Sequence, residues 1–364
     1  MALTLAGSLA RQEGSWMRER DGSIRLLGDA EALLIVSARA ALPRASQAHR
    51  IEQQVEQRLH AEGIEASISL TPVRVGYLRE LPAHIFGYEL RNTGRVLWGD
   101  RRILDLVPGM ERAQLPRADA WRLLANRMIE LLPSAWLQRR QAPTSHGEIY
   151  PWVKLYLDMA TSLLVFQQAY APSYRERAAR VRLMAAQCPL GAAWVGDLEE
   201  CTEWKLRPNE AKPSCFASPQ GCIEAIGAAR MLWRWELREL TSSGRDASDQ
   251  ELWQRWLRQQ SWGSRLRGWM SAARRNLPAA GRHWPRWAWM ARRASPRHWI
   301  YSAGSDLLFR LSELGDPDPA CDAEVLDRLP MPRTDDRREK VSRAEEAVAL
   351  VGTNYRSLVV STRA

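Results

Sequence analysis

The sequence has no apolar run near the roughly 20 residues that a membrane-spanning helix needs. Residues 1–6 also lack the basic start and apolar core of a signal peptide. Cysteine is scarce, with five in 364 residues and no CxxC pair. This usage favours reduced thiols over a disulfide framework, so we expect a cytoplasmic protein. A zinc site from Cys201, Cys215 and Cys222 is the alternative, although their spacing matches no familiar ligand pattern.

Positive charge is abundant, but it is concentrated in one segment. From Leu252 to Ser305 the chain carries eleven arginines and no Asp or Glu, while the formal net charge of the whole chain is +10. The basicity is therefore a property of this segment and not of the whole protein.

Apolar patterns predict an α+β fold with short strands in the first part of the chain. At 364 residues there is room for two or three domains. Ala32–Val36 has the length of a buried strand, and His49–Glu62 has a helical apolar face. Ala66–Leu70 alternates with period two and predicts a strand that stops at Pro72.

From about Asp119 the pattern becomes helical, and Glu203–Gly221, rich in proline, is expected to be a loop. The expected helices cover Trp121–Leu132 (ended by Pro133), Val153–Ala169, Ser173–Ala186 and Ile223–Leu240. The predicted segments are an α+β domain (1–112), a helical domain (113–245), a basic Trp/Arg-rich helical extension (246–310) and an irregular C-terminal tail (311–364).

The stretch from Leu5 to Val36 carries residues suited to phosphate and metal chemistry. Gly7-Ser8 predicts a small turn that enters a helix, which offers close backbone approach, N–H donors and a hydroxyl to phosphate groups. Asp29 and Glu31 are two residues apart before an apolar strand, so their carboxylates would point the same way. Such a pair could hold the hard divalent cations that phosphoryl transfer uses.

The run Gly7-Ser8-Leu9-Ala10-Arg11, followed by Asp29-Ala30-Glu31 and a strand, resembles the polymerase-beta-type nucleotidyltransferase superfamily. It is most similar to the minimal-nucleotidyltransferase branch, and the likeness covers the first third of the chain. The resemblance implies a nucleotidyltransferase fold there. It also implies that Asp29 and Glu31 are catalytic residues that bind Mg²⁺ or Mn²⁺. It implies that Gly7 and Ser8 contact phosphates. The superfamily moves a nucleoside monophosphate to an acceptor and releases pyrophosphate.

The sequence departs from this superfamily before Asp29. The gap between Ser8 and Asp29 is long, with Asp21-Gly22 indicating an inserted turn, and Gly28 stands where the superfamily often has serine.

A third carboxylate on a later strand, which serves the superfamily as base or metal ligand, is also hard to place. Glu65 is the nearest acid and our candidate catalytic residue, Glu89 is a weaker one, and Ser67 occupies the expected place. Without that acid the acceptor hydroxyl lacks its obvious general base.

Other charged residues have two readings each. Lys154 could hold a triphosphate from the helical domain, or form a surface ion pair with Asp158 one turn later. Arg11 and Glu13 are expected to pair with each other or to face water. Asp29 and Glu31 could also be ordinary strand-edge residues, with Ser8 as a helix N-cap.

The basic segment from Trp253 to Trp299 contains eight of the 17 tryptophans. Arginine among aromatic rings can bind nucleic acid, and the same composition suits an amphipathic helix on an anionic surface. The tryptophans could instead form the core of the helical region, with arginines as a solvated rim. His283 and His298 have no matching ligand pair.

The sequence thus predicts a metal-dependent nucleotidyltransferase with a nucleoside triphosphate donor, expected to be ATP, and an unidentified acceptor. The alternative is a non-catalytic nucleotide- or nucleic-acid-binding module that retains the fold.

Overall fold

The structure, a computed structural model, describes residues 1–313, 324–332 and 343–359. The chain forms two compact units, each described here by itself. The first contains Met1–Ala120 and Thr144–Ser214, and the second contains Trp121–Pro143 and Cys215–Ala364. This grouping differs from the predicted segments 1–112, 113–245, 246–310 and 311–364. No described helix is both long enough and apolar enough to cross a membrane.

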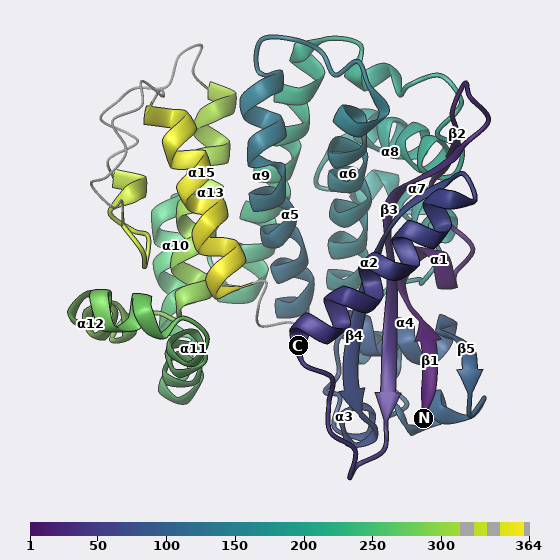
Figure 1. Cartoon of the computed structure of the whole chain (residues 1–364). Helices are drawn as coiled ribbons and strands as arrows, with labels where there is room; N and C mark the ends of the chain where they lie inside the picture. The colour runs from purple at the N-terminus through teal and green to yellow at the C-terminus, as the bar shows by residue number, and fades with distance from the viewer. Residues whose placement is uncertain (314–323, 333–342, 360–364) are drawn as a thin grey trace. The chain divides into compact units, whose positions relative to one another are not determined.

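A mixed five-stranded sheet forms the centre of the α+β part of the first unit (Figure 1). Its strands are β1 (Ala2–Leu5), β2 (Trp16–Arg18), β3 (Ile24–Val36), β4 (Ile64–Arg74) and β5 (Arg95–Gly99). The long strand β3 pairs antiparallel with β1 and β2, and β1 pairs antiparallel with β5. On its other side β3 pairs parallel with β4. The prediction of an α+β fold is confirmed.

One face of this sheet is covered by α3 (Val75–Arg79), α4 (Ile85–Thr93) and the 3-10 turn η1 (Ile103–Leu106). The core there includes Ala2 of β1, Leu33 and Ile35 of β3, and Val73 of β4. Because alternate strand residues share a face, Asp29 and Glu31 lie on the same side of β3 as Leu33 and Ile35. The two acids are exposed in the middle of β3, before the part of the strand that enters this core.

Helix α2 (Ala45–Ala61) confirms the helix expected at 49–62 and packs along β4. Its Glu56 and Glu52 carboxylates accept hydrogen bonds from the backbone N–H groups of Ile68 and Leu70, at 2.8 and 2.7 Å. The prediction that Pro72 stops this strand is wrong, since β4 continues to Arg74. Among the described strands, β4 pairs only with β3, and an edge strand tolerates a proline because it has N–H groups outside the ladder.

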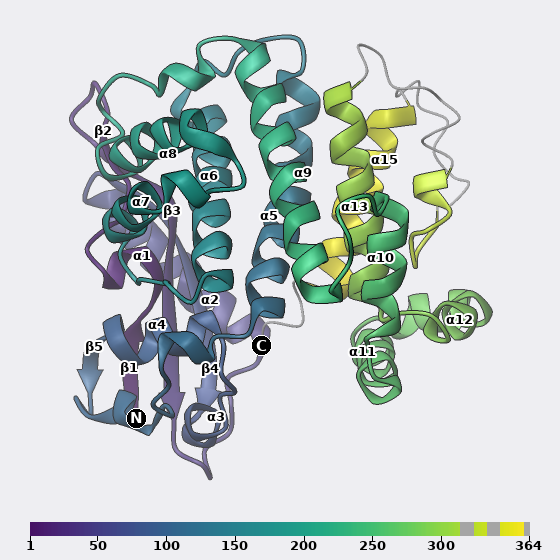
Figure 2. The same ribbon diagram turned by 180° about the vertical axis from the view of Figure 1, so that it is seen from behind.

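Three further helices of the first unit pack against one another (Figures 1 and 2): α6 (His146–Phe166), α7 (Tyr174–Leu183) and α8 (Gly191–Leu206). α6 and α7 were expected with slightly different bounds. α8 was not expected, and it extends to Leu206 where a loop was predicted from Glu203. Its buried positions, Trp194, Leu198, Cys201 and Lys205, follow helical spacing.

The second unit is helical. Its elements are α5 from Trp121 onward (whole helix Arg117–Gln138), α9 (Pro219–Thr241), α10 (Asp249–Arg258), α11 (Trp262–Arg275), α12 (Leu277–Ala291), α13 (Pro296–Glu313) and α15 (Arg343–Leu358). The prediction that Pro133 ends a helix is wrong. α5 continues through it, and the buried side chains of Leu131, Leu132 and Ala135 outweigh one missing N–H donor. The prediction of an irregular C-terminal tail is wrong for Arg343–Leu358, because these residues form helix α15, which packs on α13. The tail residues 314–323, 333–342 and 360–364 lie outside the described residues.

Aromatic rings form much of the core of the second unit. Trp121 of α5 is fully buried, and its ring centroid lies 5.7 Å from Trp253, 5.6 Å from Tyr301 and 6.1 Å from the stacked ring of His298. Burial, together with nearby arginines that include Arg297, lowers the pKa of His298 to about 3. The interpretation of the tryptophans as core is therefore correct for some of them.

We predict that His298 makes the protein acid-sensitive. Its pKa is about 3 in the native state against an ordinary 6.5, so below pH 6.5 the unfolded chain binds a proton that the native state excludes. The free energy of unfolding should therefore fall between pH 6.5 and 4.5, and fall less steeply in His298→Gln. Urea unfolding of both proteins across this range measures the difference, and parallel pH profiles would contradict it.

Candidate active site

The Gly7-Ser8 turn lies against Glu31, in the middle of β3. Gly7 starts the one-turn helix α1 (Gly7–Ala10) with a φ of 66°, a value that favours glycine. A Cβ atom on Gly7 would lie 2.9 Å from Oε2 of Glu31. The backbone N–H of Ala6 also donates to the carbonyl of Glu31 at 2.8 Å. Any side chain at position 7 would therefore displace the Glu31 carboxylate.

Ser8 is half-buried within α1 and does not cap it. The N-cap position belongs to Ala6, whose side chain makes no capping hydrogen bond. The interpretation of Ser8 as an ordinary N-cap is wrong, because the helix starts two residues earlier than that interpretation requires.

A wide irregularity in β3 precedes the two acids. Arg25 pairs with Glu65 and Asp29 pairs with Ser67, so three residues of β3 stand opposite the single residue Ala66 of β4. Bulges of this kind kink a strand and re-aim the side chains next to them. The exposed carboxylates of Asp29 and Glu31 follow directly after this kink.

The structure gives a physical reason for glycine at position 28. A Cβ atom there would lie 2.7 Å from the hydroxyl oxygen of Tyr150, on α6. Tyr150 therefore occupies the space that a side chain at position 28 would need. Sequence reasoning identified the departure but not this tyrosine.

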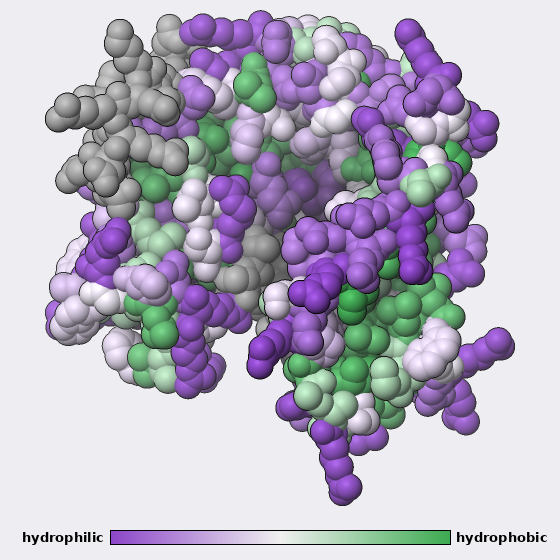
Figure 3. All heavy atoms as spheres, in the orientation of Figure 1, coloured by the Kyte–Doolittle hydropathy of each residue, from purple (hydrophilic) through white to green (hydrophobic). Residues whose placement is uncertain are grey.

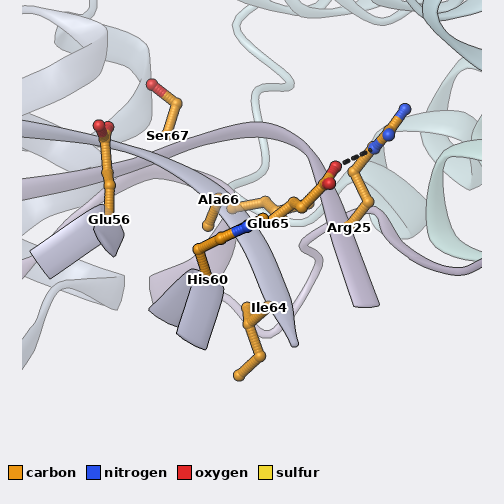
Figure 4. A pocket seen from close by; sticks show the side chains of 8 residues that line it. Arg25, Glu56, His60, Ile64, Glu65, Ala66 and Ser67 are labelled. Carbon is orange, nitrogen blue, oxygen red and sulfur yellow. Dashed lines mark hydrogen bonds and ion pairs between the residues drawn. The ribbon is translucent and has the colours of Figure 1, made fainter. Parts of the chain in front are cut away.

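Glu65 is bound to an arginine. Its Oε2 lies 2.7 Å from Nε of Arg25, and Figure 4 shows the two side chains meeting beside a shallow hollow of about 440 Å³. Other residues that line this hollow include Glu56 and His60 of α2, and Ser67. The residue opposite Asp29 in the strand register is Ser67, not Glu65.

Glu89 is engaged in a buried network and is not a free base. Its carboxylate accepts a hydrogen bond from Arg11 at 2.7 Å, and others from Arg177 and from the hydroxyl of Tyr170. Burial opposes ionisation of Glu89, but the charges of Arg11 and Arg177 outweigh it and hold its pKa below the ordinary value. Glu89 therefore joins α4 to α7 and to the loop after α1.

Arg11 and Glu13 pair as expected, but away from water. Their Nε and Oε2 atoms are 3.3 Å apart, and both side chains are buried. The Glu13 carboxylate also accepts hydrogen bonds from the hydroxyl of Ser173 at 2.7 Å and the backbone N–H of Tyr174 at 3.0 Å. These contacts tie the loop after α1 to the start of α7.

Two lysines and two tyrosines form a cluster, and one of these tyrosines, Tyr150, approaches Gly28. Nζ of Lys205 is 5.7 Å from the ring centroid of Tyr150 and 5.5 Å from that of Tyr174, and Nζ of Lys154 is 5.5 Å from Tyr150. The side chain of Asp158 is buried, so the expectation that Asp158 lies at the surface is wrong. Sequence reasoning missed Lys205 and the tyrosines; a lysine on the apolar stripe of α8 was the available signal.

Lys205 is 1% exposed, and its ammonium group donates to the backbone carbonyl of Glu13 at 2.9 Å. In return, the hydroxyl of Ser15 donates to the carbonyl of Lys205 at 2.7 Å. Burial, and then the charges of Lys154 and Arg11, lower the pKa of Lys205 to about 7. The side chain is thus a buried cationic centre that can lose its proton near neutral pH.

The carboxylates suit a metal that is shared with phosphates. Among the residues that the structure describes, no three His, Cys, Asp or Glu side chains converge to hold a metal ion. Mg²⁺ often uses only one or two carboxylates and takes its other ligands from substrate phosphates and water. Asp29 and Glu31 fit that arrangement, whereas a metal site made by the protein alone would need more ligands.

Comparison with protein-family models, with curated proteins and with solved structures gives no match to this chain. The function is therefore argued from the geometry of the site.

We predict that Gly28→Ala destabilises the protein by about 1 kcal/mol, in the range of overpacking costs, because its methyl group meets the Tyr150 hydroxyl. The double variant Gly28→Ala/Tyr150→Phe should recover part of this loss, since the oxygen nearest to the new methyl is gone. Urea unfolding of the wild type, both single variants and the double variant measures the coupling. If the losses in unfolding free energy of the two single variants simply add up in the double variant, position 28 does not contact the Tyr150 hydroxyl.

We predict that Lys205 makes stability rise with pH above neutrality. The native lysine loses its proton near pH 7, whereas the unfolded lysine keeps it to about pH 10.5, so the unfolded state binds more protons between these values. The free energy of unfolding of the wild type should increase relative to Lys205→Met from pH 7 to 9.5. Lys212→Met, at an exposed site, is the matched control. An equal profile for wild type and Lys205→Met would refute the prediction.

Proposed function

We propose that this chain is a metal-dependent nucleotidyltransferase that moves a nucleoside monophosphate from a nucleoside triphosphate, expected to be ATP, to an acceptor. The observation that carries the proposal is the contact between the Gly7 turn and the Glu31 carboxylate, with Asp29 beside it on the same strand face. A phosphate-sized group near Gly7 would stand next to both acids. The mixed sheet with α1 and α2 supports the nucleotidyltransferase fold that the sequence pattern implies.

Asp29 and Glu31 would hold Mg²⁺ or Mn²⁺, which supplies positive charge to the triphosphate and to the leaving pyrophosphate. The remaining work belongs to the chain itself. The missing side chain of Gly7 allows the phosphates to approach the backbone, and the Ser8 hydroxyl can donate to them.

Positive charge from α6 and α8 lies beside Tyr150, and Lys205 also contacts the loop after α1. Lys154 and Lys205 share contact with the Tyr150 ring, whose hydroxyl reaches Gly28 next to Asp29. Lys154 is half-buried and fits the role of a phosphate-binding point charge. Lys205 is enclosed, and we assign it the positioning of the Arg11–Ser15 loop.

A non-catalytic nucleotide-binding module is the second candidate, and one observation favours it. Ser67 stands opposite Asp29, while Glu65 and Glu89 are each bound to arginine. A serine hydroxyl is a poor general base, so an acceptor hydroxyl would need another group to take its proton.

We predict metal-dependent nucleotide binding that requires Asp29 and Glu31. Calorimetry with each of the four nucleoside triphosphates, with and without Mg²⁺, should show binding that weakens at least tenfold in Asp29→Asn/Glu31→Gln, because the metal loses both carboxylates. Asp21→Asn, in the exposed turn between β2 and β3, is the matched control and should bind like wild type.

Transfer is tested with α-phosphate-labelled nucleotides and cell extract as the source of acceptors. Label transferred by wild type and lost in the double variant supports the enzyme. Binding without transfer supports the non-catalytic module, and the absence of metal-dependent binding refutes both. The variant Glu65→Gln tests whether Glu65 is the third carboxylate. Because Glu65 pairs with Arg25, we expect the variant to retain transfer. Loss of transfer would restore Glu65 as the third carboxylate.

A further inference from the structure

Helix α11 has an apolar stripe that faces water. Trp262, Leu266 and Met270 follow one another at four-residue spacing and are 59%, 45% and 46% exposed. The adjoining face of the helix supplies the contact with the protein. There Trp269 and Ala272 are buried, and the indole N–H of Trp269 donates to the carbonyl of Ala294 at 2.8 Å.

Helix α12, which packs against α11, repeats this arrangement. Leu277 and Trp284 are 69% and 65% exposed, and both lie on one side of the helix. Trp287 and Met290 are buried on the adjoining face, where the indole N–H of Trp287 donates to the carbonyl of Pro330 at 2.9 Å. The two helices, Trp262–Ala291, are called the α11–α12 hairpin below. In each helix, buried apolar residues and exposed apolar residues occupy adjoining faces.

Exposed arginines accompany these outer apolar sides. Arg267 and Arg274 lie next to the α11 stripe on the helical wheel, and Arg282 is exposed on α12. Two other arginines have structural roles, because Arg265 donates to the carbonyl of Arg292 and Arg286 donates to that of Leu329. No Asp or Glu occurs between residues 252 and 305. In Figure 3 apolar and strongly polar residues stand side by side over this hairpin.

We propose that the α11–α12 hairpin docks the protein on a membrane surface of acidic phospholipids. Arginines complement the negative headgroups, and the exposed stripe enters the boundary between headgroups and acyl chains. Tryptophan suits this boundary because its indole is apolar with one polar N–H. Leu266, Met270 and Leu277 distinguish this surface from a nucleic-acid site, since aliphatic side chains gain little against stacked bases while lipid buries them. The proposal does not depend on nucleotidyl transfer.

Co-sedimentation of the full chain with vesicles tests the proposal. Phosphatidylcholine vesicles with about one third phosphatidylserine should bind the protein, and pure phosphatidylcholine should bind it at least tenfold more weakly, because the headgroup charge attracts the arginines. Binding should weaken with added salt, and tryptophan emission should shift to the blue as the exposed indoles leave water.

Two variants identify the surface. Trp262→Ser/Leu266→Ser/Met270→Ser removes the stripe, and Arg267→Gln/Arg274→Gln removes the adjacent charge; each should lower vesicle binding at least tenfold. Trp98→Ser/Leu183→Ser, which removes exposed apolar residues from the first unit, is the matched control and should bind like wild type. All five altered hairpin positions are exposed, and circular dichroism checks that each variant is folded.

Three outcomes would overturn the proposal: no binding to acidic vesicles, equal binding by the stripe variant, or an equal loss in the matched control. Fluorescence anisotropy with a labelled single-stranded oligonucleotide tests the other anionic partner. Oligonucleotide binding that needs Arg267 and Arg274, without vesicle binding, would assign the hairpin to nucleic acid instead.

Discussion

The candidate site depends on the buried ionic contacts that hold the loop after α1. Arg11 joins this loop to Glu89 on α4, Glu13 binds the start of α7, and Lys205 on α8 donates to the carbonyl of Glu13. Removing one partner from such a network leaves an uncompensated buried charge, which costs far more than an exposed ion pair contributes. The network therefore fixes the backbone that leads from the Gly7 turn, so that the turn stays against Glu31.

Local patterns predicted the elements that carry the acids, whereas the contacts between elements escaped prediction. The apolar run of β3 and the face of α2 were visible because period-two and period-3.6 spacing reflect one-sided burial. Glu65 was the candidate because it is the nearest acid, while Ser67 was expected at the place of the third carboxylate. The strand register does place Ser67 opposite Asp29, but the irregularity before Asp29 was not expected. A register shift of this kind leaves no periodic signal in the sequence.

Lys205 and Tyr150 escaped prediction for a different reason. The position of Lys205 on the apolar stripe of α8 was a signal of burial, but a lysine is seldom fully buried, and that general rule outweighed the signal. Its neighbours come from α6 and α7, and only the tertiary fold brings them together. For the basic segment, by contrast, the sequence left three interpretations open and gave no means of choosing among them. Trp287 and Trp284 have the same composition around them, and burial alone separates the core residue from the exposed one.

The pair Ser67 and Asp29 determines how far the geometry supports catalysis. Binding a metal-bound triphosphate requires negative ligands and close backbone approach, and Gly7, Asp29 and Glu31 provide both. Transfer further requires that the acceptor lose a proton, and the strand position that could supply a carboxylate carries a hydroxyl. Lys205, with a pKa near 7, is the nearby group whose proton is labile, but its enclosure by Tyr150, Tyr174 and Glu13 suits positioning rather than proton exchange with an acceptor. Nucleotide binding therefore follows more directly from this site than the deprotonation step does, and an acceptor that already carries negative charge would need that step least.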